Sequence, residues 1–271
     1  MEPRLRGYLR DGLILIALAA VVFLAVWFLV PKKVPFGKPV GALALDLERQ
    51  LGLSLEKAIL HDPGLITDAT VTNAVGAVKR RVLEGAVGVP FTVRVVVVKN
   101  REANAFTFPG GVIVVYSGLL SICDRPEELA AVLAHEVGHV SHRDSVRALA
   151  QQVGVAVLMA VISGGNGGQA GDLIQQVTAI HYGKSVEADA DAYAVETLRR
   201  ARLSPAHLAA FFRKIQALQG PEEALLKWVD VHPETEARIK GAEAAAAQTT
   251  VVDKPIPVNW AAMKRRLPSA F

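Results

Sequence analysis

Cysteine is almost absent from this chain, because Cys123 is the one cysteine in 271 residues. A single cysteine excludes an intramolecular disulfide and any zinc site built from cysteine ligands. Aromatic residues make up only 6% of the sequence, and the basic residues behind its net charge of +4 form no long stripe with aromatics between them. Such a stripe is typical of proteins that bind nucleic acid, so we expect no nucleic-acid partner.

One long uncharged run lies near the amino terminus. Leu13 to Val30 contains 18 residues without a charged side chain, and as a helix it would cover about 27 Å, close to the hydrocarbon core of a bilayer. The alternatives are a cleaved signal peptide and a buried core helix. Cleavage is disfavoured because Pro31 and Lys32 follow the run without a small-residue cleavage site. We therefore predict an uncleaved transmembrane anchor, with membrane lipid as its partner.

The orientation of this anchor rests on the basic residues at its two ends. Three arginines precede the run and three lysines follow it, so the positive-inside count is a tie. The short amino-terminal flank favours an amino terminus inside the cell, with the bulk of the chain outside the cytoplasm. The flanking residues are Arg4, Arg6, Arg10, Lys32, Lys33 and Lys38.

The first chemical signal is a strongly helical run at 129–142, LAAVLAHEVGHVSH. It contains the pattern H-E-x-x-H, formed by His135, Glu136 and His139. Positions i and i+4 share one face of a helix, so both histidines can bind one zinc ion. Glu136 is rotated about 100° from His135 and can instead take a proton from the attacking water. The alternative is a helix whose histidines merely pack or face solvent, but signals downstream also indicate a metal site.

The third ligand is predicted on a later helix that reads SVEADADAYAVETLRR. Glu187 and Asp191 are four residues apart and share one face of this helix. We expect Glu187 to be a carboxylate ligand and Asp191 to accept the free ring N–H of a zinc-bound histidine. His142 is left out of the ligand set, because a catalytic zinc needs an open position. The expected cofactor is one Zn²⁺ per chain.

Two runs rich in β-branched residues, Phe91 to Lys99 and Gly111 to Tyr116, predict the strands of a small sheet. Between them lies the stretch Asn104, Ala105 and Phe106, which we interpret as a substrate-binding sheet edge. An extended peptide can add to such an edge through main-chain hydrogen bonds. The alternative is an ordinary connection whose aromatic residues lie in the core.

Helix boundaries are predicted from caps and breakers. Val40 to Leu60 has helical spacing that Gly52 is expected to interrupt. Asp124 and Glu127 have the spacing of a capping box, which predicts that the metal-binding helix begins directly after Asp124, with Pro126 in its first turn.

The carboxyl-terminal part holds two further candidates. His232 precedes a helix over 234–247 that carries Arg238. At a helix start, His232 is expected to donate to an oxyanion rather than to be buried, and the alternative is a capping or surface histidine. The tail from Thr249 either docks on its own domain or plugs the site.

Four motifs in this order resemble the HtpX and CAAX-prenyl-protease family of membrane-associated zinc metallopeptidases. The resemblance implies that His135, His139 and Glu187 bind zinc and that Glu136 is the catalytic base. It also implies that Asp191 supports the ligands, and that His232 and Arg238 stabilise the transition state and control access to the metal. The motifs are HEVGH at 135–139, EADAD at 187–191, NAF at 104–106 with PGG at 109–111, and HPETEARI at 232–239.

The chain departs from that pattern by having one clear transmembrane segment instead of several. It is therefore more similar to the bacterial envelope and mitochondrial quality-control members, and we expect a single-pass protein of the bacterial inner membrane with a periplasmic domain. The expected fold is α+β, mostly α: a zincin-type (gluzincin-like) metallopeptidase domain with a small β-sheet, after one transmembrane helix. The predicted organisation is a flank over 1–11, an anchor over 12–30, a linker over 31–39, a zinc metallopeptidase domain over 40–247 and a tail over 248–271.

The predicted function is zinc-dependent endopeptidase activity on polypeptides, including misfolded envelope proteins, in protein quality control. The rival hypothesis is a membrane-anchored binding or holdase protein with a gated zinc site that rarely cleaves. A structural membrane protein without zinc is a weaker alternative. Sequence leaves the oligomeric state open.

Overall fold

The computed structural model describes residues 40–163, 167–217, 232 and 236–268. The predicted transmembrane anchor and linker therefore lie outside the described residues. The chain divides into two units, Met1–Leu43 and Ala44–Phe271, and the architecture below is that of the second unit.

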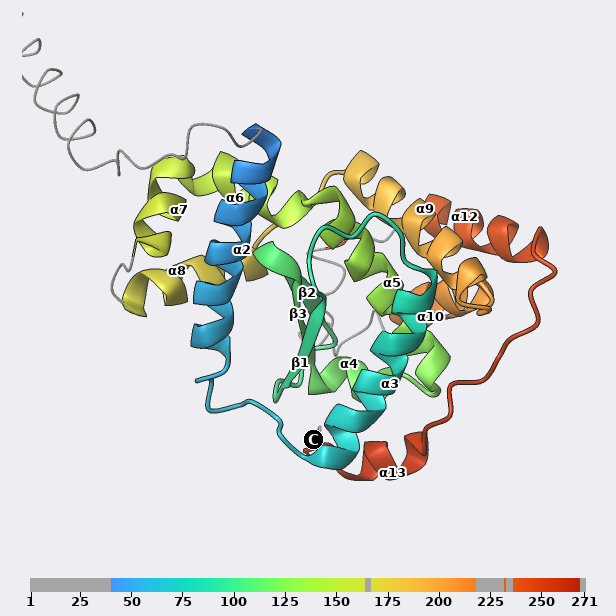
Figure 1. The fold of residues 1–271 in the computed structure, drawn as a ribbon. Helices are drawn as coiled ribbons and strands as arrows, with labels where there is room; N and C mark the ends of the chain where they lie inside the picture. Colours follow the sequence, from blue (N-terminus) through green and yellow to red (C-terminus); the bar gives the residue numbers. More distant parts are fainter. Residues whose placement is uncertain (1–39, 164–166, 218–231, 233–235, 269–271) are drawn as a thin grey trace, which may run out of the picture. The chain divides into compact units, whose positions relative to one another are not determined.

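A three-stranded sheet lies at the centre of this unit (Figure 1). Strands β1 (Arg94–Val98) and β3 (Val112–Tyr116) are parallel, and β2 (Ala105–Phe108) pairs antiparallel with β3, which gives the order β1-β3-β2. The sequence predicts β1 and β3. The stretch between them, expected as a connection with a substrate-binding edge, forms an edge strand of the same sheet.

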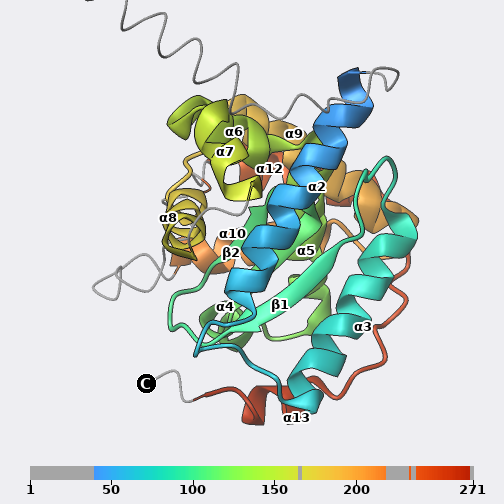
Figure 2. The same cartoon turned by 60° about the vertical axis from the view of Figure 1, so that its left-hand side comes forward.

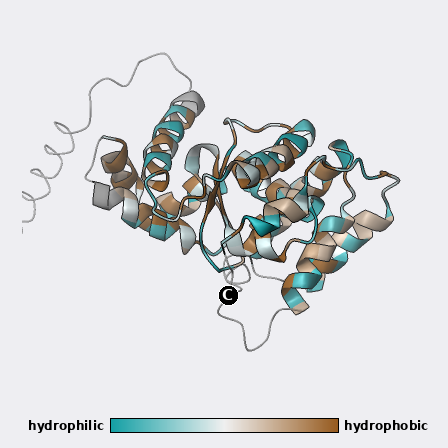
Figure 3. Cartoon of the chain, turned by 90° about the horizontal axis from the view of Figure 1, so that it is seen from below, coloured by the Kyte–Doolittle hydropathy of each residue, from teal (hydrophilic) through white to brown (hydrophobic). Residues whose placement is uncertain are grey.

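Helices cover both faces of the sheet (Figure 2), and each face has its own hydrophobic cluster. The strands themselves are hydrophobic, whereas the helices alternate between hydrophilic and hydrophobic residues (Figure 3). One face packs on α2 (Val40–Ile59), α6 (Asp144–Val153), α7 (Val155–Ile162) and α8 (Gly167–Thr178). The cluster on the other face joins the sheet to residues of α3 (Ala69–Gly85), α4 (Ser117–Ile122), α5 (Pro126–His142), α9 (Lys184–Arg200), α10 (Ala206–Ala217), α12 (Glu236–Ala247) and α13 (Trp260–Arg265). This mostly helical arrangement with a small sheet confirms the expected α+β class.

Helix α2 corrects the expectation of a break at Gly52, because the helix runs through this residue. A Cβ atom added to Gly52 would lie 2.4 Å from the carbonyl oxygen of Pro109. The glycine therefore allows α2 to approach the backbone of the 3₁₀ turn η1 (Pro109–Gly111), which links β2 to β3. Close packing, rather than a helix end, explains this residue.

The start of α5 differs by one residue from the predicted capping box. Its N-cap residue is Arg125, whose side chain makes no capping hydrogen bond, and Pro126 occupies the first turn. The reciprocal hydrogen bond of a capping box is made by Glu128 and not by Glu127: the Asp124 N–H donates to Glu128 Oε2 over 2.9 Å. The Asp124 carboxylate instead accepts from Lys214 Nζ, at 2.6 Å.

The described part of the tail docks on the outside of the domain. Trp260 donates its ring N–H to the carbonyl oxygen of Cys123 over 3.0 Å, and Arg266 forms an ion pair with Asp68 at the start of α3. Of the two predicted alternatives, docking on its own domain describes these residues.

Among residues 40–268, as far as they are described, no single helix is long and apolar enough to cross a membrane. Helices α6 and α7 together meet the length and hydropathy criteria, but they are bent by 109° at Gly154.

Candidate active site

Helix α5 carries three site residues, and its contact with α9 supplies a fourth. His135, Glu136 and His139 are completely buried in the second half of α5. Gly138 lies against α9, where an added Cβ atom would be only 3.1 Å from the carbonyl oxygen of Ala190. This close approach brings Glu187 onto the histidines.

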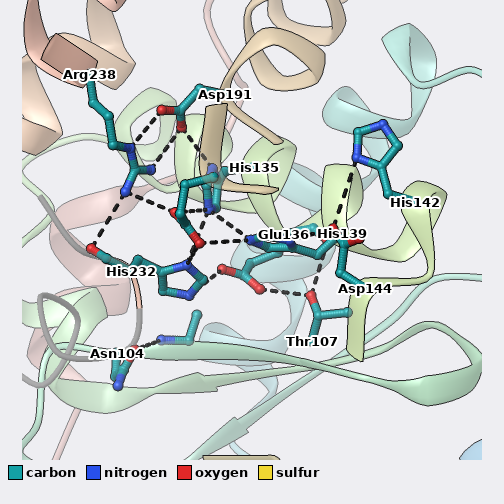
Figure 4. Close-up of polar contacts among 12 residues, drawn as sticks. Asn104, Thr107, His135, Glu136, His139, His142, Asp144, Asp191, His232 and Arg238 are labelled. Atoms are coloured by element: carbon teal, nitrogen blue, oxygen red, sulfur yellow. Dashed lines mark hydrogen bonds and ion pairs between the residues drawn. The ribbon is translucent and has the colours of Figure 1, made fainter. Parts of the chain in front are cut away.

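Four donor residues from three parts of the chain converge, and the three histidines among them are labelled in Figure 4. One ligand atom from each of His135, His139, Glu187 and His232 lies within 4.8 Å of the others. The Nε2 atoms of His135 and His139 are 3.1 Å apart, and they lie 3.4 and 3.5 Å from the two carboxylate oxygens of Glu187. Ligands about 2.0–2.1 Å from a tetrahedral zinc lie about 3.3–3.4 Å from one another. The spacing of the donors therefore fits a zinc ion.

Carboxylates fix the tautomer of both helix histidines. His135 Nδ1 donates to Asp191 Oδ1, and His139 Nδ1 donates to Asp144 Oδ2, each over 2.9 Å. Because a carboxylate only accepts, a proton lies on Nδ1 of each ring, and a neutral ring then has its lone pair on Nε2. Two neutral rings would face each other through these lone pairs at 3.1 Å. A metal ion between the two Nε2 atoms, or a proton on one of them, removes this repulsion.

Charge in the site is unbalanced. Four buried or nearly buried carboxylates surround the histidines, whereas the fixed cations near them are the buried Arg238 and the exposed Arg147, which lies 3.9 Å from Asp144. Burial by itself would lower the pKa of His135, but its hydrogen bonds to Asp191 and Glu187 reverse this effect and raise the pKa to about 10. The surroundings of His135 thus favour positive charge, as a metal site does. The carboxylates are Glu136, Asp144, Glu187 and Asp191.

Arg238 binds two carboxylates of α9, Asp191 and Glu187. Its guanidinium donates to the two oxygens of Asp191, over 2.7 and 2.8 Å, and lies 2.8 Å from Glu187 Oε2. Burial would raise the pKa of Asp191, but the bonds from Arg238 and His135 outweigh it and lower the pKa. In this arrangement Arg238 orients the supporting carboxylates rather than a reacting oxygen.

His232 corrects one expectation, because it is buried and not exposed at a helix start. Its exposed fraction is 1%. Its Nδ1 lies 2.9 Å from Glu187 Oε1 and 3.3 Å from His135 Nε2. His232 is thus part of the donor group, at a place where the sequence predicts an open coordination position.

The predicted substrate edge is present but covered. Asn104, Ala105 and Phe106 are 0%, 0% and 4% exposed. Ala105 and Phe106 belong to β2, the outer strand next to β3, and the Ala105 N–H donates to Asn104 Oδ1 over 2.9 Å. Phe106 packs edge-on against Tyr116, as expected from the alternative in which the aromatic residues of this stretch lie in the core.

Two residues near the site escaped the sequence reasoning. Asp144 supports His139, because Arg143 adopts a left-handed conformation (φ 59°, ψ 35°) that ends α5 and turns the chain back. Thr107 on β2 donates to Glu136 Oε2 over 2.7 Å. No spacing rule links a strand residue to a helix 29 positions later, so this contact had no signal in the sequence. His142, omitted from the predicted ligands, lies outside the donor group.

Comparison with known proteins decides the family. The profile described as Peptidase family M48 matches residues 71–246, well over half of the chain. The chain belongs to peptidase family M48. Family membership confirms the predicted resemblance and the predicted enzyme class, a zinc metallopeptidase. It also identifies the cofactor as zinc, which the donor set fits.

Individual M48 relatives show how much is shared. The chain is 30% identical to the beta-barrel assembly-enhancing protease of Yersinia pestis over 230 residues, 78% of this chain and 46% of that protein. It is 31% identical to metalloprotease LoiP of Escherichia coli over 62% of this chain and 65% of that protein. It is 26% identical to the mitochondrial metalloendopeptidase OMA1 of Schizosaccharomyces pombe over 74% and 61%. The match to the first of these relatives covers about half of that protein's length.

Proposed function

We propose that this M48 protein is a membrane-anchored zinc endopeptidase that cleaves polypeptides. The observation that supports this most directly is the buried glutamate beside a zinc-fitting donor set. A bound zinc ion would polarise the scissile carbonyl and make the attacking water more acidic. His135, His139 and Glu187 would hold it, with Asp191 and Asp144 fixing the two imidazole rings.

Glu136 would act as the general base and then as the proton donor. Its carboxylate lies on the helix that carries both histidine ligands, and Oε1 is 3.5 Å from His232 Nε2. Oε1 would accept the proton of the attacking water and pass it to the leaving amine. Arg238 would keep Asp191 and Glu187 in place while this happens.

Substrate recognition is proposed at β2. A peptide that adds to the edge beyond Asn104, Ala105 and Phe106 would gain main-chain hydrogen bonds without a requirement for particular side chains. Such recognition suits unfolded segments, so we propose misfolded envelope proteins as the substrate class. Because these residues are buried, the parts of the protein that cover the strand have to move before a substrate binds.

The location is proposed from sequence. Residues 12–30 would anchor the chain in a bacterial inner membrane, with the zincin-type (gluzincin-like) domain over 40–247 on the periplasmic side. The length and hydropathy of the uncharged run support this proposal.

Casein cleavage by the full chain in detergent tests the function. Glu136→Gln should keep zinc and lose at least about 100-fold in rate, since general base catalysis contributes about 10²–10⁴-fold. Glu128→Gln is the matched control, because it removes a carboxylate from the other end of the same helix and should cleave normally. Equal cleavage by Glu136→Gln and the wild type would refute the mechanism.

A gated, rarely cleaving zinc protein is the second candidate, and the position of His232 favours it. As a fourth donor it would fill the position that water needs. If it does so, His232→Ala should cleave casein faster than the wild type at the same zinc content. Slower cleavage would instead return His232 to the predicted role of oxyanion donor.

A further inference from the structure

We propose that Thr107 is a positioning residue that holds the Glu136 carboxylate in the orientation needed for proton transfer. This inference rests on the proposed peptidase function. It concerns a residue outside the zinc-binding motif and outside the predicted substrate-binding residues.

The contact is short, buried and charge-assisted. Thr107 Oγ1 lies 2.7 Å from Glu136 Oε2 and 3.0 Å from the main-chain carbonyl oxygen of Glu136. One hydroxyl hydrogen serves one acceptor at a time, and the shorter bond to a carboxylate is the stronger. Thr107 and Glu136 are 3% and 0% exposed, so no bulk water competes for the bond.

The two carboxylate oxygens of Glu136 have different surroundings. Oε2 accepts the hydroxyl hydrogen of Thr107. Oε1 is buried and accepts no hydrogen bond within the described residues, and it lies 3.5 Å from His232 Nε2, beside the donor group. A general base needs this asymmetry, because one oxygen is held while the other remains available to the attacking water.

Strand alternation explains why Thr107 can reach the helix. Successive residues of a strand point to opposite faces. Phe106 and Phe108 belong to the hydrophobic cluster on the α2 side, and Ala105 belongs to the cluster on the α5 side. Thr107 therefore points to α5 (Figure 4). Its strand is also the edge along which we propose that substrate binds, so one strand would position both the peptide and the base.

Thr107→Val keeps the shape of the side chain and removes the donor. The freed carboxylate could rotate away from the attacking water, which impairs the chemical step and leaves substrate affinity unchanged. We expect kcat to fall by about 10- to 100-fold with little change in KM, part of the about 10²–10⁴-fold effect of a positioned base. Thr107→Ser restores a hydroxyl and should recover kcat to within about threefold.

The kinetic test uses the full chain in detergent, a fluorogenic casein substrate and zinc analysis of each sample. Thr197→Val is the matched control, because Thr197 is also buried but lies on α9 away from Glu136, and it should keep the wild-type kcat. Wild-type kcat in Thr107→Val, or equal losses in the valine and serine variants, would overturn the positioning role.

A second measurement separates this inference from the proposed function. In a double-mutant cycle of Thr107→Val and Glu136→Leu, the free energies of unfolding in urea should be non-additive, because the two side chains interact. Additivity would overturn the inference whatever the activity. If the free energies were non-additive but the wild-type chain cleaved no casein, the catalytic role of Thr107 would be overturned together with the proposed function.

Discussion

Helix α5 has a polar cluster at each end, and the two clusters differ in their balance of charge. At its start, Lys214 donates to Asp124 over 2.6 Å and to Glu128 over 2.7 Å, and Lys264 lies 3.9 Å from Asp124. Two cations thus meet two carboxylates. At the other end, four carboxylates surround the histidines, with Arg238 and the exposed Arg147, which lies 3.9 Å from Asp144. The charges of the first cluster balance, whereas the second has an excess of carboxylates that a further cation would offset.

The same kinds of interaction therefore have different consequences at the two ends, because their surroundings differ. Lys214 joins α10 to α5 and its cluster is partly solvated, with the Asp124 side chain 71% exposed. Glu187 joins α9 to α5 and is 1% exposed. Water can screen the first cluster but not the second. An excess of buried negative charge, more than the presence of polar groups, distinguishes a metal site from a structural ion pair.

Of the changes that distinguish the two clusters, removal of zinc should have the largest effect. A chelator leaves the excess carboxylates unpaired, so the melting temperature should fall, and zinc at about 1,000 times its Kd should restore about 4 kcal/mol. Differential scanning calorimetry with and without zinc measures the shift. The Lys214→Met variant should show the same zinc-dependent shift. A melting temperature independent of zinc would mean that the second cluster is already complete.

Loss of one supporting carboxylate should have a smaller effect. Asp144→Asn removes the charged acceptor of His139 Nδ1 and should weaken zinc binding by about 10- to 100-fold. Competition with a fluorescent chelator measures the affinity. Asp124→Asn, at the start of the same helix, is the control and should bind zinc normally. If both variants bound zinc like the wild type, Asp144 would have no part in the metal site.

The smallest effect is expected at the charge-balanced cluster. Asp124→Asn should lower the free energy of unfolding by about 1 kcal/mol or less, because the ion pairs of this exposed carboxylate contribute little, and should leave casein cleavage unchanged. The hydrogen bond from Lys214 lowers the pKa of Asp124 below its usual value. The pair therefore stabilises the fold above about pH 4, the usual Asp value, and loses this contribution as the pH falls further.

Urea unfolding of the zinc-free wild type and Asp124→Asn at pH 7 and pH 3 measures this contribution. The difference between the two chains should shrink at the lower pH. A difference that grows in acid would show that another group sets the stability of this end of α5.

Local spacing was enough to predict the elements that bear the chemistry. The i and i+4 positions of His135 and His139, and of Glu187 and Asp191, follow from helix geometry, and the structure shows all four on the two packed helices α5 and α9. The prediction of the N-cap, which depended on one exact residue, was wrong. The N-cap of α5 is Arg125 and not Asp124, because the side chain of Asp124 is used by Lys214, 90 residues away.

Residues that reach the site across the fold could not be predicted. Thr107 meets Glu136 because a strand pairs with β3 and packs on α5, and Asp144 reaches His139 because of a left-handed turn at Arg143. His232 was expected at an exposed helix start, and its burial follows from its packing among the ligand atoms. Each of these depends on contacts that sequence spacing does not encode.

Sequence alone predicted the zinc-binding pattern, its helices and the place of Glu136 between the two histidines, because these depend on the regular geometry of a single helix. Tertiary structure decided the rest: which carboxylate supports each histidine, that His232 joins the donor group, and that Thr107 donates to Glu136. The physical reason is that a buried charge is stabilised by whatever groups surround it in three dimensions, and those groups come from distant parts of the chain.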